Sequence, residues 1–271
     1  MTQVVANGHR LNVERRGEGA PLLLLHGFTG SHETWAPFSD SWAGTETIAL
    51  DLLGHGHSPS PDDPARYRMQ WAIEDIVALL DDLELPHVAL LGYSLGGRVA
   101  LRLALAVPER IDGLILESAS PGIDSASERR ARVAADRALA DRIEREGLEA
   151  FIDYWESLPL WSSQSSLDAP TRERLRRQRL RNNPRGLANS LRGMGAGCDP
   201  SVISDLANLS MPTLLISGEL DAKYCDIAAA MRQRIPSARH HFVERAGHAV
   251  HLEQPAAFAA LVADCLTALR S

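Results

Sequence analysis

Apolar residues in this chain fall into short runs, separated by stretches in which apolar positions recur at helical spacing. The runs have the length of buried β-strands and lie near residues 22–25, 47–50, 88–92, 112–117, 212–217 and 238–243. Helical patterns cover 71–83, 95–106, 227–234 and 255–269. At the start of the chain, Asn7-Gly8 between two strand-like runs predicts a β-hairpin. This alternation predicts an α/β fold with a mostly parallel sheet and helices on both faces.

The interval between the predicted strands at 112–117 and 212–217 is too long for a simple crossover. It begins with a Ser120-Pro121-Gly122 turn and contains three helical stretches rich in arginine and glutamate. A structureless loop of that length is rare in a compact domain. Residues 120–205 are therefore predicted to form a helical cap, inserted after the sixth strand, while 1–119 and 206–271 form the core.

Composition narrows the class of protein. With 271 residues and 45% apolar content, the chain is long enough for a sizeable core. No segment approaches the length of a membrane span, and the start lacks a basic and then apolar leader, so a cytoplasmic protein is expected. A net charge of −7 argues against non-specific nucleic-acid binding. Nothing in the sequence indicates an oligomeric state.

The segment Gly92-Tyr93-Ser94-Leu95-Gly96-Gly97 lies between a predicted strand and a predicted helix. Glycines on both sides of the serine allow the tight turn that places its side chain at the tip of the loop. The G-x-S-x-G pattern alone also suits an ordinary glycine-rich turn. In its strand-turn-helix context, however, Ser94 is predicted to be a nucleophile.

Two further polar residues follow predicted strands in the order that such a serine requires. Asp221 comes just after the strand at 212–217, and His248 follows the strand at 238–243. A serine needs an imidazole to accept its proton, and the imidazole needs a carboxylate to orient it. Ser94, Asp221 and His248 are therefore predicted to form a catalytic triad in the chain order of the α/β-hydrolases.

A third strand end supplies candidate oxyanion donors. The strand at 22–25 runs into His26-Gly27-Phe28, and loops of this kind contribute one backbone N–H while the residue after the nucleophile contributes another. The donors are assigned to Phe28 and Leu95. His26 is predicted to be a structural hydrogen bonder that shapes the loop.

Other histidines and the cysteines give no sign of a metal site. His55 and His57 lie in the segment from Asp51 to Ser58, but no third ligand stands at a suitable spacing, so both are predicted to be solvated loop residues. The three cysteines are odd in number and far apart, which argues against a disulfide framework or a zinc site. No metal or cofactor is expected.

The core motifs are shared by a whole superfamily, whereas several cap motifs are more specific. The chain resembles the 2-succinyl-6-hydroxy-2,4-cyclohexadiene-1-carboxylate synthase family of menaquinone biosynthesis from Leu23 to about Glu253. The resemblance rests on 92–100, 116–122, Asp153-Tyr154-Trp155 with Leu158-Pro159-Leu160, Asn182-Asn183-Pro184 and 191–195. It implies a cofactor-free elimination of pyruvate from a small-molecule substrate with three carboxylates, the triad acting as a base.

Such a polycarboxylate substrate requires cationic groups, and arginine can bind a carboxylate through two parallel hydrogen bonds. Arg98 lies one helical turn after Ser94, so its side chain can face the same pocket. The resemblance adds Arg132 and Arg179 as carboxylate ligands. Neighbouring arginines at 129, 130, 177 and 181 leave that register open.

The resemblance further implies that Tyr93 and Trp155 are walls of the pocket, although Trp155 could instead belong to the core of the cap. Two other functions remain open at this stage. The same triad would serve a carboxylesterase or a C–C bond hydrolase, in which Ser94 is the nucleophile. A non-catalytic ligand receptor is the alternative of another class, because a fold does not fix a function.

Overall fold

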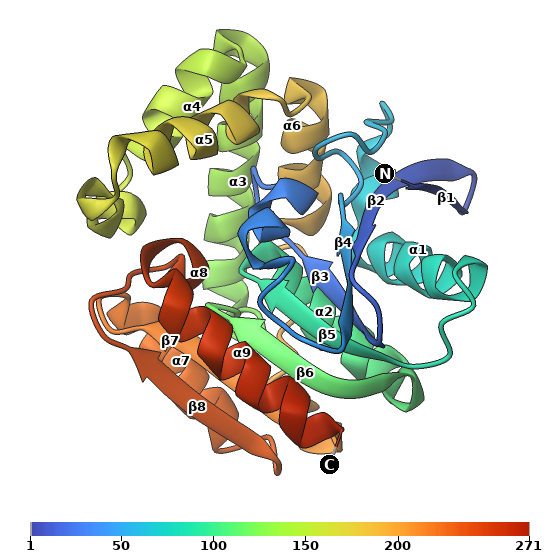
Figure 1. The fold of residues 1–271 in the computed structure, drawn as a ribbon. Helices are drawn as coiled ribbons and strands as arrows, with labels where there is room; N and C mark the ends of the chain where they lie inside the picture. Colours follow the sequence, from blue (N-terminus) through green and yellow to red (C-terminus); the bar gives the residue numbers. More distant parts are fainter. Residues whose placement is uncertain (1, 271) are drawn as a thin grey trace.

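The computed structural model describes residues 2–270, and its centre is one eight-stranded sheet (Figure 1). The strand order is β1-β2-β4-β3-β5-β6-β7-β8; β1–β2 and β2–β4 are antiparallel, and all other pairs are parallel. The strands are β1 (Thr2–Ala6), β2 (His9–Arg16), β3 (Ala20–Leu25), β4 (Thr45–Leu50), β5 (Val88–Tyr93), β6 (Ile111–Glu117), β7 (Thr213–Gly218) and β8 (Ala238–Val243). The mostly parallel sheet and the N-terminal hairpin are confirmed.

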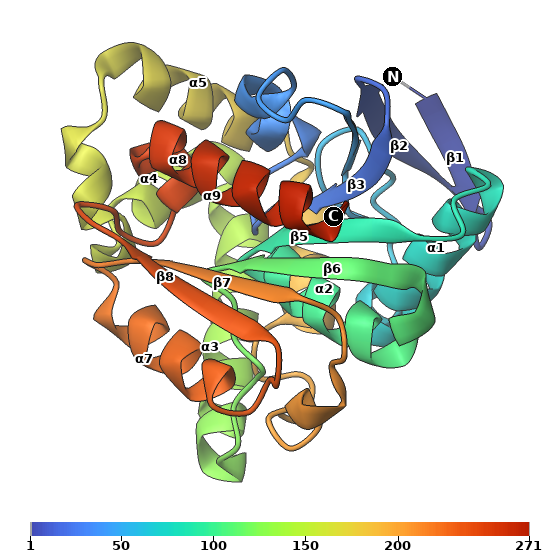
Figure 2. The ribbon, with the colours of Figure 1, turned by 60° about the horizontal axis from the view of Figure 1, so that its bottom comes forward.

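Side chains of successive strand residues enter two different cores, as the pleat of a sheet requires. On one face, Leu23, Leu25 and Leu90 pack with α1 (Met69–Asp82), α2 (Leu95–Ala106) and α7 (Ala222–Arg232). On the other, Leu22 and Leu24 pack with η1 (His32–Phe38) and α9 (Pro255–Leu269). Figure 2 shows α9 on one side of the sheet and α2 and α7 on the other. Burial on both faces explains the continuous apolar runs of the strands.

The segment between β6 and β7 is helical. It contains α3 (Ala126–Glu146), α4 (Leu148–Glu156), η4 (Pro159–Ser166), α5 (Ala169–Leu180) and α6 (Pro184–Met194). Phe151, Ile152 and Leu187 form a small apolar core of their own with residues of α3. Figure 1 shows α4, α5 and α6 together at the top of the view, beyond the end of the sheet. The helical insertion after the sixth strand is confirmed, while the cap bounds at 120 and 205 stay a prediction.

One helix begins earlier than its sequence pattern indicates. The apolar pattern starts at Ile227, whereas α7 begins at Ala222. The side chain of Asp221 accepts a hydrogen bond from Tyr224 N (3.4 Å) and so caps the helix, which allows polar residues to form its first turn.

None of the helices within residues 2–270 combines the length and the apolar character that spanning a membrane requires.

Candidate active site

Ser94 lies at a strained turn between β5 and α2. Its φ is +51° and its ψ −106°, a conformation that a residue with a Cβ rarely adopts. The turn is held by Ser94 N, which donates to Glu117 O (2.9 Å), and by close packing of Gly96, where a Cβ would lie 2.2 Å from Leu25 O. The strained turn therefore brings the start of α2 against the end of β3.

The three side chains singled out by their strand-end positions are hydrogen-bonded to one another. His248 Nε2 lies 3.0 Å from Ser94 Oγ, and His248 Nδ1 lies 2.6 Å from Asp221 Oδ2. His248 is 1% exposed and Asp221 9% exposed. The parallel strands β5, β7 and β8 end at the same edge of the sheet, so loops far apart in sequence meet there. This geometry suits transfer of the serine proton to the imidazole.

Two backbone N–H groups beside the serine are free to bind a developing negative charge. Among the residues that the structure describes, neither Phe28 N nor Leu95 N donates a hydrogen bond. Leu95 is the first residue of α2, where the helix dipole also favours negative charge. The loop of Phe28 approaches Ser94 closely, because a Cβ on Gly27 would lie 3.6 Å from the serine Cβ.

Arg98 lies between the core and the cap. Its Nη2 donates to Met194 O (2.6 Å), the carbonyl of the last residue of α6. Burial lowers the pKa of Arg98, and Tyr224 and Arg132 are among its electrostatic neighbours. Tyr224 packs its ring 4.5 Å from that of His248, so the partly buried guanidinium lies near the triad.

The other two predicted arginines differ in environment. Arg132 of α3 is 43% exposed at its side chain, and its Nε donates to Asp136 Oδ1 (2.9 Å), whereas no described residue binds its terminal nitrogens. Arg179 of α5 is 5% exposed and pairs with Glu156 through Nη1 (3.0 Å). Arg98 and Arg132 therefore lie near each other, whereas Arg179 approaches from a different part of the cap.

Aromatic rings surround the imidazole. Tyr93 and Trp161 lie 5.6 Å from the ring of His248, and Trp155 lies 5.5 Å from Trp161 and 5.3 Å from Phe28. Tyr93 thus contacts the triad directly, while Trp155 contacts it through other rings. Trp155 also packs on Phe151 in the core of the cap. Its contacts are therefore compatible with both predicted roles, a wall of the pocket and a residue of the cap core.

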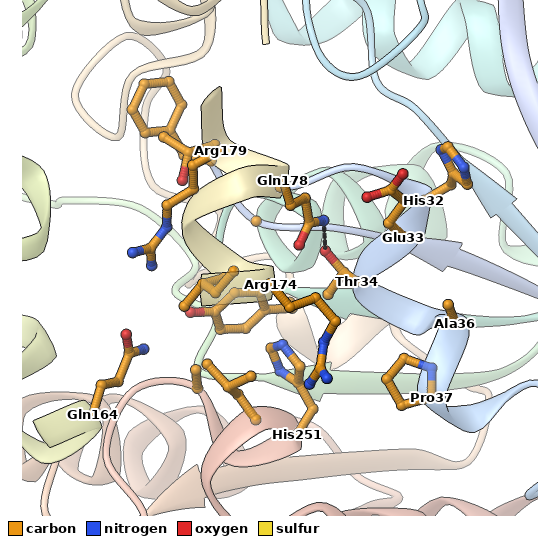
Figure 3. Close-up of a pocket in the computed structure, with 18 of the residues that line it drawn as sticks. His32, Glu33, Thr34, Ala36, Pro37, Gln164, Arg174, Gln178, Arg179 and His251 are labelled. Atoms are coloured by element: carbon orange, nitrogen blue, oxygen red, sulfur yellow. Dashed lines mark hydrogen bonds between the residues drawn. The ribbon is translucent and has the colours of Figure 1, made fainter. Parts of the chain in front are cut away.

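A cavity of about 650 Å³ opens next to these rings. It is lined by residues 27–30, which contain the predicted donor Phe28 and are called the oxyanion loop here, and by Tyr93, Trp161, Gln164, Arg179 and His251, together with parts of η1 and α5. Figure 3 shows α5 above this space, with Gln178 hydrogen-bonded to Thr34 of η1 (2.8 Å). Its volume is that of a small-molecule site, and its wall joins residues of the cap to residues of the core.

Comparison with known proteins identifies the family. The model of the α/β hydrolase fold family matches residues 20–255. The chain is 44% identical over 267 residues to a Bacillus subtilis (strain 168) protein provisionally named 2-succinyl-6-hydroxy-2,4-cyclohexadiene-1-carboxylate synthase, which covers 98% of this chain and 97% of that protein. The synthase of Klebsiella pneumoniae (strain 342) is 34% identical over 255 residues, covering 94% and 97%. MenH from S. aureus superimposes with a TM-score of 0.91 at 31% identity, covering 96% of this chain and 99% of that one.

The chain belongs to the 2-succinyl-6-hydroxy-2,4-cyclohexadiene-1-carboxylate synthase family. This synthase family is part of the α/β-hydrolase superfamily, and its members are enzymes. The resemblance inferred from the cap motifs is confirmed.

In this family member, buried hydrogen bonds hold the oxyanion loop in place. His26 Nδ1 donates to Gly27 O (2.8 Å) and its Nε2 accepts from Leu52 N (3.1 Å), so the structural role predicted for His26 is confirmed. From the cap, Asn182 Nδ2 donates to Thr29 O (2.9 Å). The loop is thus fixed from both the core and the cap, as a preorganised anion site requires.

The prediction that both His55 and His57 are solvated is wrong for His55. His57 is exposed, but His55 is fully buried, with its ring 5.0 Å from that of His26 and 5.9 Å from that of Phe28. Its Nδ1 donates to Leu53 O (3.2 Å), while its Nε2 is buried without a partner in the described part of the chain. Burial lowers the pKa of His55 to about 3. A glycine-rich loop predicts an exposed position, whereas this loop packs against the cap, with Gly56 N donating to Asn182 Oδ1 (2.9 Å).

The buried imidazole makes stability depend on pH. An unfolded chain protonates His55 near its ordinary pKa of 6.5, whereas the folded protein does so only near 3, so the free energy of unfolding falls as pH drops below 6.5. We expect His55 to contribute a loss of roughly 2 kcal/mol between pH 7 and pH 5. His55→Gln should remove that part of the slope in urea unfolding curves measured at both pH values. The exposed neighbour provides the control: His57→Gln should keep the wild-type slope, and a wild-type slope in His55→Gln would contradict the assignment.

Several residues around the triad escaped the sequence analysis. Tyr224 and Trp161 pack on His248, and His251 packs its ring 4.7 Å from that of Tyr93. His251 Nδ1 and its backbone N both hydrogen-bond to the fully buried Glu117 (2.9 and 3.0 Å), which ties the segment after His248 to the end of β6. The sequence offers a signal for Tyr224, because it stands three residues after the predicted triad residue Asp221. Trp161 carries no comparable signal.

Proposed function

We propose that the protein eliminates pyruvate from 2-succinyl-5-enolpyruvyl-6-hydroxy-3-cyclohexene-1-carboxylate and so forms 2-succinyl-6-hydroxy-2,4-cyclohexadiene-1-carboxylate, a step of menaquinone biosynthesis. The observation that carries the proposal is the hydrogen-bonded series Ser94–His248–Asp221 near the partly buried guanidinium of Arg98. The relationship to named synthases over nearly the whole chain supports the choice of reaction.

In this proposal the triad removes a proton from carbon. His248, oriented by Asp221, accepts the proton of Ser94, and the serine oxygen takes the proton α to the succinyl ketone. The 3.0 Å contact between His248 Nε2 and Ser94 Oγ is within the distance that such a transfer requires. No covalent bond to Ser94 is formed.

The electron pair left by that proton is first stabilised as an enolate and then used to break a carbon–oxygen bond. Phe28 N and Leu95 N donate to the developing oxyanion. The pair then moves through the ring double bond and expels the enolpyruvyl group, which accepts a proton and leaves as pyruvate. Every group that acts in these steps belongs to this chain, and no cofactor takes part.

The arginines account for the choice of substrate. The substrate carries three carboxylates, and Arg98, Arg132 and Arg179 each retain nitrogens that no described residue engages. In a poorly hydrated pocket an ion pair with a carboxylate is stronger than in water. A neutral ester offers these groups nothing to bind, which favours the lyase over a carboxylesterase.

The proposal is tested by incubating the protein with the enolpyruvyl substrate and following pyruvate through NADH oxidation by lactate dehydrogenase. We expect steady pyruvate release and at best slow cleavage of p-nitrophenyl acetate. Efficient ester cleavage without pyruvate release would make the protein a hydrolase. Tight substrate binding with neither reaction would make it a receptor.

A further inference from the structure

Three hydrogen-bond donors in the wall of the cavity have no partner among residues 2–270. They are Trp161 Nε1, Gln164 Nε2 and Arg179 Nε, and each is buried without a hydrogen bond. Trp161 and Gln164 are each 8% exposed, and Arg179 is 5% exposed. All three residues line the cavity of about 650 Å³ that adjoins the triad, and all three also line a second cavity of about 470 Å³ formed by residues of η4 and α5.

An N–H group that is buried without an acceptor costs about 1–3 kcal/mol, so such groups are rare in folded proteins. Three of them around one cavity indicate that a bound molecule supplies the acceptors. Because all three are donors and one belongs to a guanidinium, the complementary group is an anion with several acceptor oxygens. A carboxylate has this chemistry.

The helix η4 places two of the three donors, Trp161 and Gln164, on the same face. A 3₁₀ helix has three residues per turn, so Trp161 and Gln164 lie one above the other on η4. The guanidinium of Arg179 lies over the indole of Trp161, at 5.4 Å from the ring. Figure 3 shows the amide of Gln164 and the guanidinium of Arg179 facing the same open space.

The carboxylate nearest to Arg179, that of Glu156, does not occupy the side of the guanidinium on which an anion would bind. Glu156 binds Arg179 Nη1 (3.0 Å) and holds the guanidinium in place, but it leaves the Nε edge free. Trp161 also contacts His248, with ring centroids 5.6 Å apart. A carboxylate held here would therefore lie about one indole ring away from the triad.

We propose that Trp161 and Gln164, together with Arg179, form a binding site for one carboxylate of the substrate, and that Trp161 and Gln164 are specificity-determining residues. The identity of the substrate rests on the proposed function; the carboxylate site itself rests on the three unpaired donors. Trp161 and Gln164 contribute to binding and leave the proton transfer to the triad.

Two conservative changes test the site, because each removes the donor and keeps the bulk of the side chain. Trp161→Phe retains a ring against His248, and Gln164→Met retains a side chain of similar length. Since a hydrogen bond to a charged acceptor is lost, we expect each change to raise KM for the enolpyruvyl substrate about tenfold with kcat within about twofold. Trp71→Phe on α1 and Gln233→Met at the exposed C-cap of α7 are matched controls and should keep the wild-type KM.

A second measurement separates this site from the reaction. Succinate is titrated into the full chain by calorimetry, and we expect Trp161→Phe and Gln164→Met each to raise its Kd about tenfold while thermal melting stays that of the wild type. Absence of pyruvate release by the wild type overturns the proposed function alone, and the succinate titration then decides the carboxylate site. A wild-type KM in both variants overturns the carboxylate site. If the wild type shows no turnover, the site is overturned by a succinate Kd that neither change alters, or by a wild type that binds no succinate.

Discussion

Ser94→Ala and His248→Ala should each lower kcat for pyruvate release by about three to six orders of magnitude, and the double variant should be little worse than either single one. The reason is the 3.0 Å contact that makes the serine and the imidazole one base: once either is removed, the other has no proton to pass on. The measurement is the coupled pyruvate assay with each variant at saturating substrate.

A second serine–histidine pair in the same fold provides the control. Ser217 Oγ lies 2.8 Å from His240 Nε2, on β7 and β8, and neither residue lines the cavity. Ser217→Ala and His240→Gln should therefore keep wild-type turnover. If the losses from Ser94→Ala and His248→Ala instead multiplied in the double variant, the two residues would act independently and the triad would be the wrong description.

Arg98→Ala should lower kcat/KM by the equivalent of about 2–5 kcal/mol, because a substrate carboxylate would lie unpaired in a poorly hydrated pocket. Arg98→Lys should restore only part of the loss, since an ammonium cannot form two parallel hydrogen bonds to one carboxylate. Steady-state kinetics on the enolpyruvyl substrate measure both effects.

The next arginine along the helix separates substrate binding from packing. Arg102 lies one turn after Arg98 on α2 and, like it, donates to a carbonyl oxygen of the segment between β6 and β7, that of Pro200. Arg102→Ala should leave kcat/KM unchanged. Equal losses in Arg98→Ala and Arg102→Ala would show that Arg98 acts by tethering the cap rather than by binding a carboxylate.

The fold could be predicted from the sequence because its strands are buried on both faces. Continuous apolar runs such as Leu22 to Leu25 differ clearly from the helical spacing of α1 and α9, and Asn7-Gly8 marks the hairpin. Where a side chain rather than apolar spacing determines a boundary, prediction failed. The early start of α7 depends on the cap formed by Asp221, which periodicity does not detect.

The sequence indicates the position of a candidate site residue most directly where that residue follows a strand. Ser94, Asp221 and His248 stand at strand ends, so topology brings them together whatever the cap does. Trp161 and Gln164 lie on a short 3₁₀ helix without an apolar pattern, and their position depends on how the cap packs over the sheet. The burial of His55 was not predictable either, because its loop packs against the cap through Gly56 and Asn182.

The most direct measurement of the central claim, that Ser94 acts as a base in pyruvate elimination, is a single turnover. Enzyme in excess over the enolpyruvyl substrate is quenched at successive times, pyruvate is quantified, and the intact mass of the protein is recorded. The account predicts one pyruvate per substrate and an unmodified protein mass throughout. An adduct on Ser94 that forms and decays at the rate of turnover, or the absence of pyruvate, would contradict it.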